Sequence, residues 1–273
     1  MEYSTLMSLV VLSCDDYSDQ WDIFFSFKEK YWPDCPFRTY LVNDTIDYRR
    51  EGVTVLNCGK ITKWSTRVRT AIEKISTPYV CPILDDHYII ERVDNQVIFS
   101  LLELSQKHGI SYLALEPRSF IQHKSYREYL IPDIALVPKH QKYGINTSAA
   151  IWNREDYIKT IGPEDYSPWQ FEINMCNLAR TEQGLPGLNV VDERNSLKIC
   201  EYEVVRQGVY LSRALKHIKK TTGVELDTSK RGVMPYWKEF IDVLNGKAAR
   251  LKYGKTIIRK VAKIFGRKYF TEA

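Results

Sequence analysis

Short apolar runs alternate with amphipathic stretches over the first 120 residues. The runs are bounded by turn-forming or charged residues, and they predict five strands: Leu9–Ser13, Arg38–Val42, Val53–Leu56, Tyr79–Leu84 and Tyr112–Leu115. Between them, apolar residues at helical spacing predict three helices, over Trp21–Trp32, Trp64–Ile75 and Asp94–His108. Strands that alternate with helices are typical of an α/β fold with a central, mostly parallel sheet.

The second half of the chain is less regular. Its loops are rich in Pro, Gly and aromatic residues. Its apolar segments predict a strand at Ala149–Trp152, a helix near Trp169–Arg180, and short strands near Asn189–Val191 and Lys198–Val205. Because the sequence contains no internal repeat and no low-complexity linker, we expect residues 1–245 to form a single domain.

Two polar clusters directly follow predicted strands. Cys14–Tyr17 follows the first strand and Asp85–His87 follows the fourth. Ligands of open α/β sheets bind at the carboxyl ends of the strands, so both clusters are candidate sites. Two adjacent carboxylates after a buried strand are costly to desolvate, and Mn²⁺ or Mg²⁺ would stabilise them. The alternative is that they make turn and helix-capping hydrogen bonds.

Composition excludes several classes of protein. Hydrophobic residues make up 44% of the 273 residues and charged residues 27%, as in folded soluble domains. No apolar run is long enough to span a membrane, and the first residues lack the basic segment of a secretory signal. The six cysteines form no C-x-x-C pair, and the glycine patterns of P-loop and dinucleotide-binding proteins are absent. We therefore expect a cytoplasmic protein with reduced thiols.

The net charge of +5 is unevenly distributed. Gly246–Phe270 carries nine basic residues and no acidic one, whereas residues 1–245 carry a net charge of −3. Apolar residues at helical spacing in Thr256–Phe270 predict a basic amphipathic helix. We expect residues 246–273 to form a C-terminal helical tail that either contacts an anionic membrane or packs on the body. Because residues 1–245 are mildly acidic overall and the excess of basic residues lies in this tail, we expect no nucleic-acid partner.

Three groups of residues together resemble bacterial GT-A-type glycosyltransferases. They are the loop after the first strand, part of the helix before the fourth strand, and the turn after the fourth strand: Ser13, Cys14, Asp15, Tyr17, Ser18 and Asp19, then Trp64, Ser65, Arg67 and Ala71, then Asp85 and Asp86. Ala150–Lys159 and Ser167–Glu172 extend the resemblance to roughly residues 8–210. The similarity is greatest to glycosyltransferases of polysaccharide and lipopolysaccharide biosynthesis. It implies a GT-A-like α/β domain, a nucleotide-diphosphate sugar donor, and a glycan or lipid-linked glycan acceptor.

The resemblance implies roles for individual donor-side residues. Asp86 would hold Mn²⁺ or Mg²⁺ with help from Asp85 or His87, since histidine stands here at the third position of the family's usual Asp-x-Asp. The implied nucleotide-binding residues are Asp15, Asp16, Tyr17, Trp64, Arg67 and Asp85. Within this set, the Tyr17 ring would stack on the base and the Arg67 guanidinium would reach the diphosphate. Ordinary packing is the alternative for the Tyr17 and Trp64 side chains.

On the acceptor side, the resemblance places the general base of an inverting transfer on Glu172. Trp169 would stack on the acceptor sugar, and Asn146, with Ser148, would line the acceptor site. Glu116 and Asp192 are alternative bases, and a solvated or helix-capping side chain is the ordinary alternative for Glu172. Through its basic tail and a lipid-linked acceptor, the protein would lie peripherally on the inner face of the cytoplasmic membrane.

Two other functions remain open at this point. A sugar-nucleotide pyrophosphorylase has a related fold, but it normally carries a glycine-rich loop with Arg or Lys after the first strand, which this sequence lacks. The chain could instead be a non-catalytic module that binds carbohydrate or membrane. Binding of a nucleoside diphosphate with Mn²⁺ distinguishes this module from an enzyme.

Overall fold

The computed structural model describes residues 3–60, 63–117 and 127–240. The chain divides into two compact units, Met1–Cys200 and Glu201–Ala273. The predicted domain boundary at residue 245 and the predicted tail helix lie outside the described residues, so both stay predictions.

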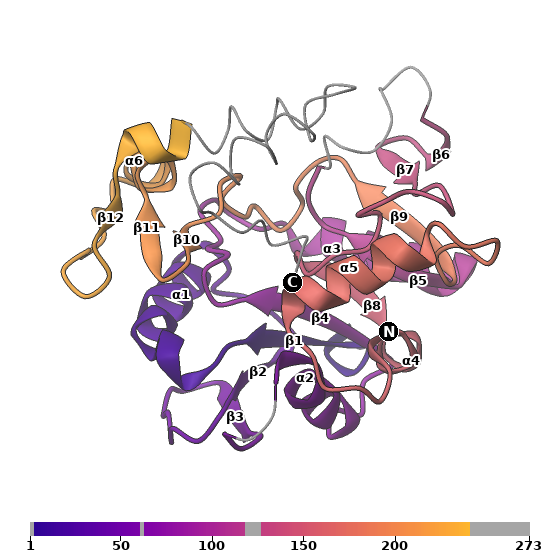
Figure 1. The fold of residues 1–273 in the computed structure, drawn as a ribbon, viewed down its shortest axis with the longest axis horizontal. Helices are drawn as coiled ribbons and strands as arrows, with labels where there is room; N and C mark the ends of the chain where they lie inside the picture. The colour runs from indigo at the N-terminus through magenta and orange to yellow at the C-terminus, as the bar shows by residue number, and fades with distance from the viewer. Residues whose placement is uncertain (1–2, 61–62, 118–126, 241–273) are drawn as a thin grey trace, which may run out of the picture. The chain divides into compact units, whose positions relative to one another are not determined.

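The described residues of the first unit form a nine-stranded mixed sheet in the order β3-β2-β1-β4-β8-β5-β9-β7-β6 (Figure 1). Its strands are β1 Met7–Leu12, β2 Arg38–Asn43, β3 Val53–Asn57, β4 Tyr79–Leu84, β5 Ile110–Ala114, β6 Tyr129–Ile131, β7 Ile134–Leu136, β8 Ala150–Asn153 and β9 Leu188–Asp192. Strand β8 runs antiparallel to its neighbours β4 and β5, and β7 runs antiparallel to its neighbours β9 and β6. All the other adjacent strands are parallel. Every residue of β1 and β5 is buried, as expected for strands covered on both faces. The predicted α/β fold with a mostly parallel sheet is confirmed.

Helices cover both faces of this sheet (Figure 1). They are α1 Ser18–Tyr31, α2 Trp64–Glu73, α3 Asn95–His108, α4 Arg154–Ile161 and α5 Pro168–Leu178. One face packs against the buried sides of α2, α4 and α5, represented by Val68, Tyr157 and Phe171. On the other face α1 and α3 meet where the Trp32 indole donates to Asn95 Oδ1 (2.6 Å).

The sheet changes direction at β1. From β1 the chain passes to β2 and β3 on one side, then returns to β4 on the other side of β1. The connections after β1 and β4 therefore diverge at the carboxyl edge of the sheet. Such a switch point is where open α/β sheets bind their ligands.

Strand β4 separates from β8 toward this edge. The β4–β8 ladder ends at the pair Val80–Trp152. Arg154 N donates to Pro78 O (2.9 Å), just before β4. Every second residue from Pro78 onward therefore points its backbone N–H and C=O groups toward β8. The next such residue is Pro82, which has no amide hydrogen to continue the ladder. The carboxyl half of β4 is thus not hydrogen-bonded to β8.

One predicted strand is wrong. In place of a strand over Lys198–Val205, Ile199 forms an isolated bridge with Ile89, and β10 covers only Val205–Arg206. The backbone of Lys198 is left-handed, with a φ of 54°, which interrupts an extended run. Residues 198–200 lie against the chain that follows β4, where Ile90 N donates to Lys198 O (2.9 Å) and Cys200 N donates to Tyr88 O (2.9 Å).

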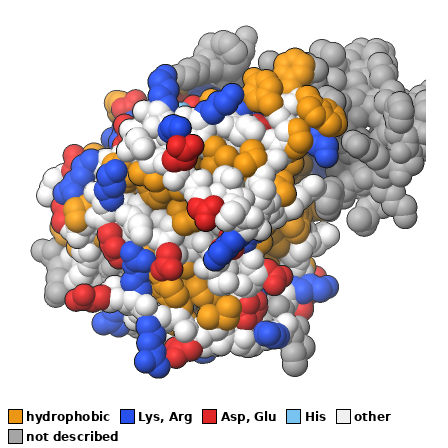
Figure 2. All heavy atoms as spheres, turned by 90° about the vertical axis from the view of Figure 1, so that its left-hand side faces the viewer, with side chains coloured by type: hydrophobic (Ala, Val, Ile, Leu, Met, Phe, Trp, Pro, Cys, Tyr) orange, Lys and Arg blue, Asp and Glu red, His pale blue; other side chains and the backbone are white. Residues whose placement is uncertain are grey.

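The described part of the second unit, residues 201–240, is small. It contains β10, β11 Val209–Leu211 and β12 Val233–Met234 in one sheet, and helix α6 Ser212–Thr222, which buries Ala214 and Ile218. No helix among the described residues has both the length and the apolar character to cross a membrane. Figure 2 shows acidic and basic side chains interspersed over one face of the molecule, so the described residues form no single-sign patch there.

Candidate active site

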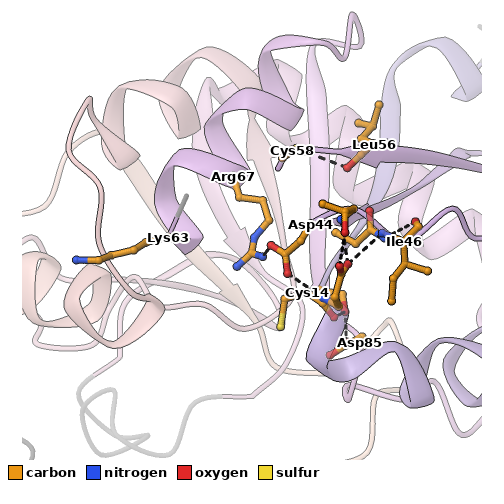
Figure 3. Close-up of polar contacts among 12 residues, drawn as sticks. Cys14, Asp44, Ile46, Leu56, Cys58, Lys63, Arg67 and Asp85 are labelled. Carbon is orange, nitrogen blue, oxygen red and sulfur yellow. Dashed lines mark hydrogen bonds and ion pairs between the residues drawn. The ribbon is translucent and has the colours of Figure 1, made fainter. Parts of the chain in front are cut away.

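The loops that follow β1, β2 and β4 are joined at the carboxyl edge by hydrogen bonds. Ser13 N donates to Val42 O (2.9 Å), and Asp15 N donates to Asp44 Oδ2 (2.9 Å). The Ser13 hydroxyl in turn donates to Asp85 Oδ2. The switch point therefore brings together the loop that begins at Cys14, Asp44 after β2 and Asp85 after β4 (Figure 3).

Asp85 is held by a short polar relay from helix α1. The Trp21 indole donates to Ser13 Oγ (2.6 Å), and this hydroxyl donates to Asp85. Asp85 is only 4% exposed, and a buried carboxylate is tolerated when such bonds replace water. The relay fixes the position of one oxygen of the aspartate pair.

Asp15 closes the loop after β1 onto the loop after β2. Its carboxylate accepts hydrogen bonds from Thr45 N (3.0 Å), Thr45 Oγ1 (2.7 Å) and Ile46 N (3.2 Å). Burial raises the pKa of Asp15, but these bonds outweigh that effect and hold the pKa below its usual value. Both oxygens of Asp15 thus bind the protein itself, whereas Asp16 is exposed and Tyr17 is half-buried.

Arg67 from α2 pairs with Asp44, which directly follows β2. Figure 3 shows its guanidinium reaching toward Asp44 while Lys63 extends away from the cluster. Both partners are mostly buried, with side chains 12% and 15% exposed. Burial raises the pKa of the neighbouring Cys14 thiol, the charge of Arg67 opposes this, and the charge of Asp85 adds to it. Asp44 was not predicted as a site residue, and its only signal is its position after a strand.

Trp64 lies in the hydrophobic core. Its side chain is 9% exposed and its ring lies 5.4 Å from Phe171 and 6.5 Å from Tyr166, measured between centroids. Because Trp64 belongs to α2 and Phe171 to α5, the contact joins these two helices. The structure does not bring the Trp64 ring to the surface of the loops described above.

The turn after β4 offers two carboxylates and one imidazole. Asp85 and Asp86 are 4% and 8% exposed, and His87 Nδ1 is buried without a hydrogen-bond partner. No group of three or more His, Cys, Asp or Glu side chains among the described residues could hold a metal ion by itself. A cation here would therefore be held by Asp86 with Asp85 or His87, and substrate oxygens and water would complete its shell, as is usual for Mg²⁺.

The segment before β8 lies at the same edge of the sheet, because β8 runs antiparallel and begins opposite the end of β5. Asn146 Oδ1 accepts bonds from Ser148 N (3.0 Å) and from the Tyr112 hydroxyl (3.3 Å). Glu172 Oε1 accepts bonds from Thr147 N (3.3 Å) and Thr147 Oγ1 (3.0 Å). Both bonds go to Oε1, so Oε2 of this half-buried carboxylate is available to a ligand.

Two exposed aromatic side chains flank Glu172. Trp169, 64% exposed, precedes it by one turn of α5, whose start is capped by Ser167. Tyr143, 46% exposed, lies near it, and its amide donates to Cys176 Sγ (3.3 Å), one turn beyond Glu172. Burial raises the pKa of Tyr143, and the charge of Glu172 contributes to the rise. Tyr143 was not predicted, and no periodicity marks it.

The alternative bases lie elsewhere along this edge. Asp192, at the end of β9, is fully buried, and its Oδ1 accepts from Arg194 Nε (2.7 Å). A carboxylate that takes a proton from a ligand must be accessible to it, so Glu172 fits such a role better than the fully buried Asp192. Glu116 is half-buried just after β5. A shallow hollow at the edge strand β3, lined by residues 47–51, 53 and 55, contains none of the predicted site residues.

No protein-family model matches the sequence, and no curated protein matches it. Among solved structures, the chain is similar to residues 1–349 of TarS from S. aureus, with a TM-score of 0.44 and 9% identity over 69% of this chain and 60% of that chain. For 2-C-methyl-D-erythritol 4-phosphate cytidylyltransferase from Thermus thermophilus the TM-score is 0.44, with 13% identity over 80% of this chain and 100% of that chain. For glycosyltransferase GlyE from Streptococcus pneumoniae the TM-score is 0.37, with 13% identity over 66% of this chain and 41% of that chain.

The chain thus spans less than two thirds of the TarS and GlyE chains that it matches. Likeness at this level concerns the arrangement of the chain and does not identify a reaction.

Proposed function

We propose that this protein transfers a sugar from a nucleoside diphosphate sugar to a hydroxyl group of a glycan or lipid-linked glycan, with inversion at the sugar carbon. The observation that carries the proposal is the arrangement of the carboxyl edge. The Asp44–Arg67 pair and the Asp85–Asp86 turn meet at the switch point, and Glu172 lies at the same edge with one oxygen left for a ligand.

The donor would bind at the switch point. A diphosphate needs positive charge, and Arg67 brings a guanidinium to the loops after β1 and β2. A bound Mn²⁺ or Mg²⁺ would stabilise the charge that develops on the departing diphosphate. Asp86, with Asp85 or His87, would hold that ion. The base would stack on Tyr17, and Asp16 would accept from its edge, because the carboxylate of Asp15 already binds residues 45 and 46.

The acceptor would bind beside Glu172. As the acceptor oxygen attacks the anomeric carbon, Glu172 Oε2 takes the hydroxyl proton. The bond from the anomeric carbon to the diphosphate oxygen breaks, and its electron pair leaves with the diphosphate. A general base of this kind contributes roughly 10²–10⁴ in rate. The exposed ring of Trp169 would stack on the acceptor sugar, and Asn146 would border the acceptor site through the loop that it stabilises.

Release of nucleoside diphosphate from UDP-, GDP- and dTDP-sugars, with and without Mn²⁺, tests the proposal. We expect Glu172→Gln to lower kcat by about 10²–10⁴ without changing donor affinity. Asp86→Ala should weaken donor binding instead. Turnover that is unchanged in the Asp86→Ala/Glu172→Ala double variant would refute the assignment.

The same assay addresses the alternatives. A pyrophosphorylase would form a nucleoside triphosphate when given pyrophosphate and the sugar nucleotide. The loop after β1 presents the carboxylates of Asp15 and Asp16 in a short 3₁₀ turn and no cationic side chain, which disfavours a triphosphate there. A non-catalytic module would bind glycan without binding any nucleoside diphosphate.

A further inference from the structure

Three large aromatic side chains are exposed together in the second unit. Tyr236, Trp237 and Phe240 are 57%, 59% and 55% exposed. They lie on the helical turn 236–240, where Tyr236 and Phe240, four residues apart, share one face and Trp237 directly follows Tyr236. Soluble proteins seldom expose a contiguous aromatic cluster without a partner for it.

A buried carboxylate fixes this aromatic turn to α6. Glu239, between the aromatic positions, is 1% exposed and accepts bonds from Ser212 N, Arg213 N (3.3 Å) and Arg213 Nε (3.2 Å). The Ser212 hydroxyl also donates to Met234 O (2.9 Å), just before the turn. A carboxylate at the first amides of a helix is stabilising, so the aromatic turn and α6 act as one element.

Two lysines lie beside the aromatic turn, and a third is exposed on α6. Lys216 Nζ lies 5.1 Å from the centre of the Tyr236 ring, and Lys238 Nζ lies 5.6 Å from that of Trp237. Lys220 is exposed further along α6. Residues 201–273 contain 17 basic and 7 acidic side chains, a net charge of +10, whereas residues 1–200 have a net charge of −5. The aromatic cluster therefore belongs to the strongly basic part of the chain.

We infer that this face, formed by Tyr236, Trp237, Phe240 and the flanking lysines Lys216, Lys220 and Lys238, binds the surface of an anionic lipid bilayer. Aromatic rings insert at the boundary between headgroups and acyl chains, while lysines keep their ammonium groups at the anionic headgroups. A single-stranded nucleic acid is disfavoured, because it requires a basic groove along which its backbone runs. The inference does not rest on the proposed sugar transfer.

Sedimentation of the full chain with vesicles tests this inference. We expect binding to phosphatidylcholine vesicles that contain phosphatidylglycerol, weak binding to pure phosphatidylcholine, and loss of binding as salt rises from about 0.1 to 1 M. Trp237→Ala/Phe240→Ala should lower partitioning by about tenfold. Tyr129→Ala/Ile131→Ala, which removes two exposed apolar side chains from β6 of the first unit, is the matched control and should bind as the unchanged protein does.

A second variant tests the inference independently, in case the first variant does not fold. Lys216→Glu/Lys220→Glu changes only exposed charges on α6, and it should also lose binding to the anionic vesicles while keeping its circular dichroism spectrum. Equal binding by the aromatic variant, equal binding to both kinds of vesicle, or binding to a single-stranded oligonucleotide in preference to vesicles would overturn the inference. Since no sugar donor is present, the result is independent of any transferase activity.

Discussion

Asp15 illustrates how single side chains shape the candidate donor site. Its carboxylate accepts three hydrogen bonds from residues 45 and 46, and so it joins the loops after β1 and β2. The neighbouring Asp16 is exposed. Two adjacent aspartates therefore differ in their surroundings, since the carboxylate of Asp15 joins two loops and the side chain of Asp16 is exposed.

The first prediction concerns the stability that Asp15 contributes. Asp15→Ala removes the exposed hydrogen bonds to residues 45 and 46 and should lower the free energy of unfolding by about 0.5–1.5 kcal/mol at neutral pH. Because the pKa of Asp15 is lower in the folded than in the unfolded chain, this contribution is present above the ordinary value of 3.8 and is lost as the pH falls through the folded-state pKa. Urea unfolding at a series of pH values measures it.

The control for this experiment is Asp16→Ala, which should change stability by less than about 0.5 kcal/mol, as exposed substitutions do. If the two variants were equally destabilised, or if the Asp15→Ala effect were as large in acid as at neutral pH, the loop would not depend on the Asp15 carboxylate.

The second prediction concerns Tyr143, whose backbone is left-handed with a φ of 57°. This conformation is unfavourable for a bulky residue and concentrates at functional sites. Asparagine tolerates it, so Tyr143→Asn should leave the unfolding free energy within about 1 kcal/mol of its original value. If the Tyr143 ring contacts the acceptor, the same variant should raise the acceptor KM without changing donor hydrolysis.

Tyr129→Asn, at another exposed tyrosine, is the control for acceptor binding. An acceptor KM that stays constant in Tyr143→Asn would remove Tyr143 from the acceptor site, and it would leave the role of Glu172 untouched.

At the scale of elements, the contact between α2 and α5 links the two halves of the candidate site. Helix α2 carries Arg67, which pairs with Asp44, and α5 carries Glu172. Trp64 packs against Phe171 between these helices. Its position explains how a tryptophan can matter to the site without touching a ligand.

The third prediction follows from that packing. Trp64→Ala should destabilise the protein by about 3–5 kcal/mol, as the loss of a large buried side chain does. Trp64→Phe retains much of the contact with Phe171, so it should cost less stability and leave the donor dissociation constant unchanged. Thermal unfolding and titration calorimetry with the donor measure the two effects. A large loss of donor affinity in Trp64→Phe, with stability maintained, would instead support the nucleotide-binding role.

The elements also differ in how far sequence predicts them. The apolar runs of β1, β4 and β5 predicted buried strands because a strand covered on both faces needs apolar residues throughout. The same pattern could not predict that β8 runs antiparallel, because strand direction depends on distant pairing. Nor could it predict that the backbone hydrogen bonds between β4 and β8 end before Pro82. Local apolar content was misleading for Lys198–Val205, which does not form the continuous strand that it predicted.

The candidate site was less predictable than the fold. The two aspartates after β4 were marked by position and charge, and Glu172 was identified through the family resemblance. Asp44 and Tyr143 were missed, because their importance comes from contacts with Arg67 and with the surroundings of Glu172 that only the folded chain creates.

At the scale of the whole molecule, charge is divided between the two units. The first unit has a net charge of −5 and contains every residue of the candidate site, and the second has a net charge of +10. A nucleoside diphosphate is itself anionic, so its binding to an acidic unit depends on local cations. In the proposed site, Arg67 would be one of them and a divalent metal ion the other.

This dependence leads to the fourth prediction. A nucleoside diphosphate sugar at 100 times its dissociation constant stabilises the folded protein by about 2.7 kcal/mol. For a chain of this size that corresponds to a rise in Tm of roughly 5–10 °C. With Mn²⁺ present we expect this rise for the unchanged protein and for the exposed-residue control Asp47→Asn, and we expect it to disappear in Asp86→Asn or when EDTA is added. A rise of equal size in EDTA would mean that Arg67 and the protein dipoles bind the diphosphate without a metal ion, and the aspartates after β4 would then be structural.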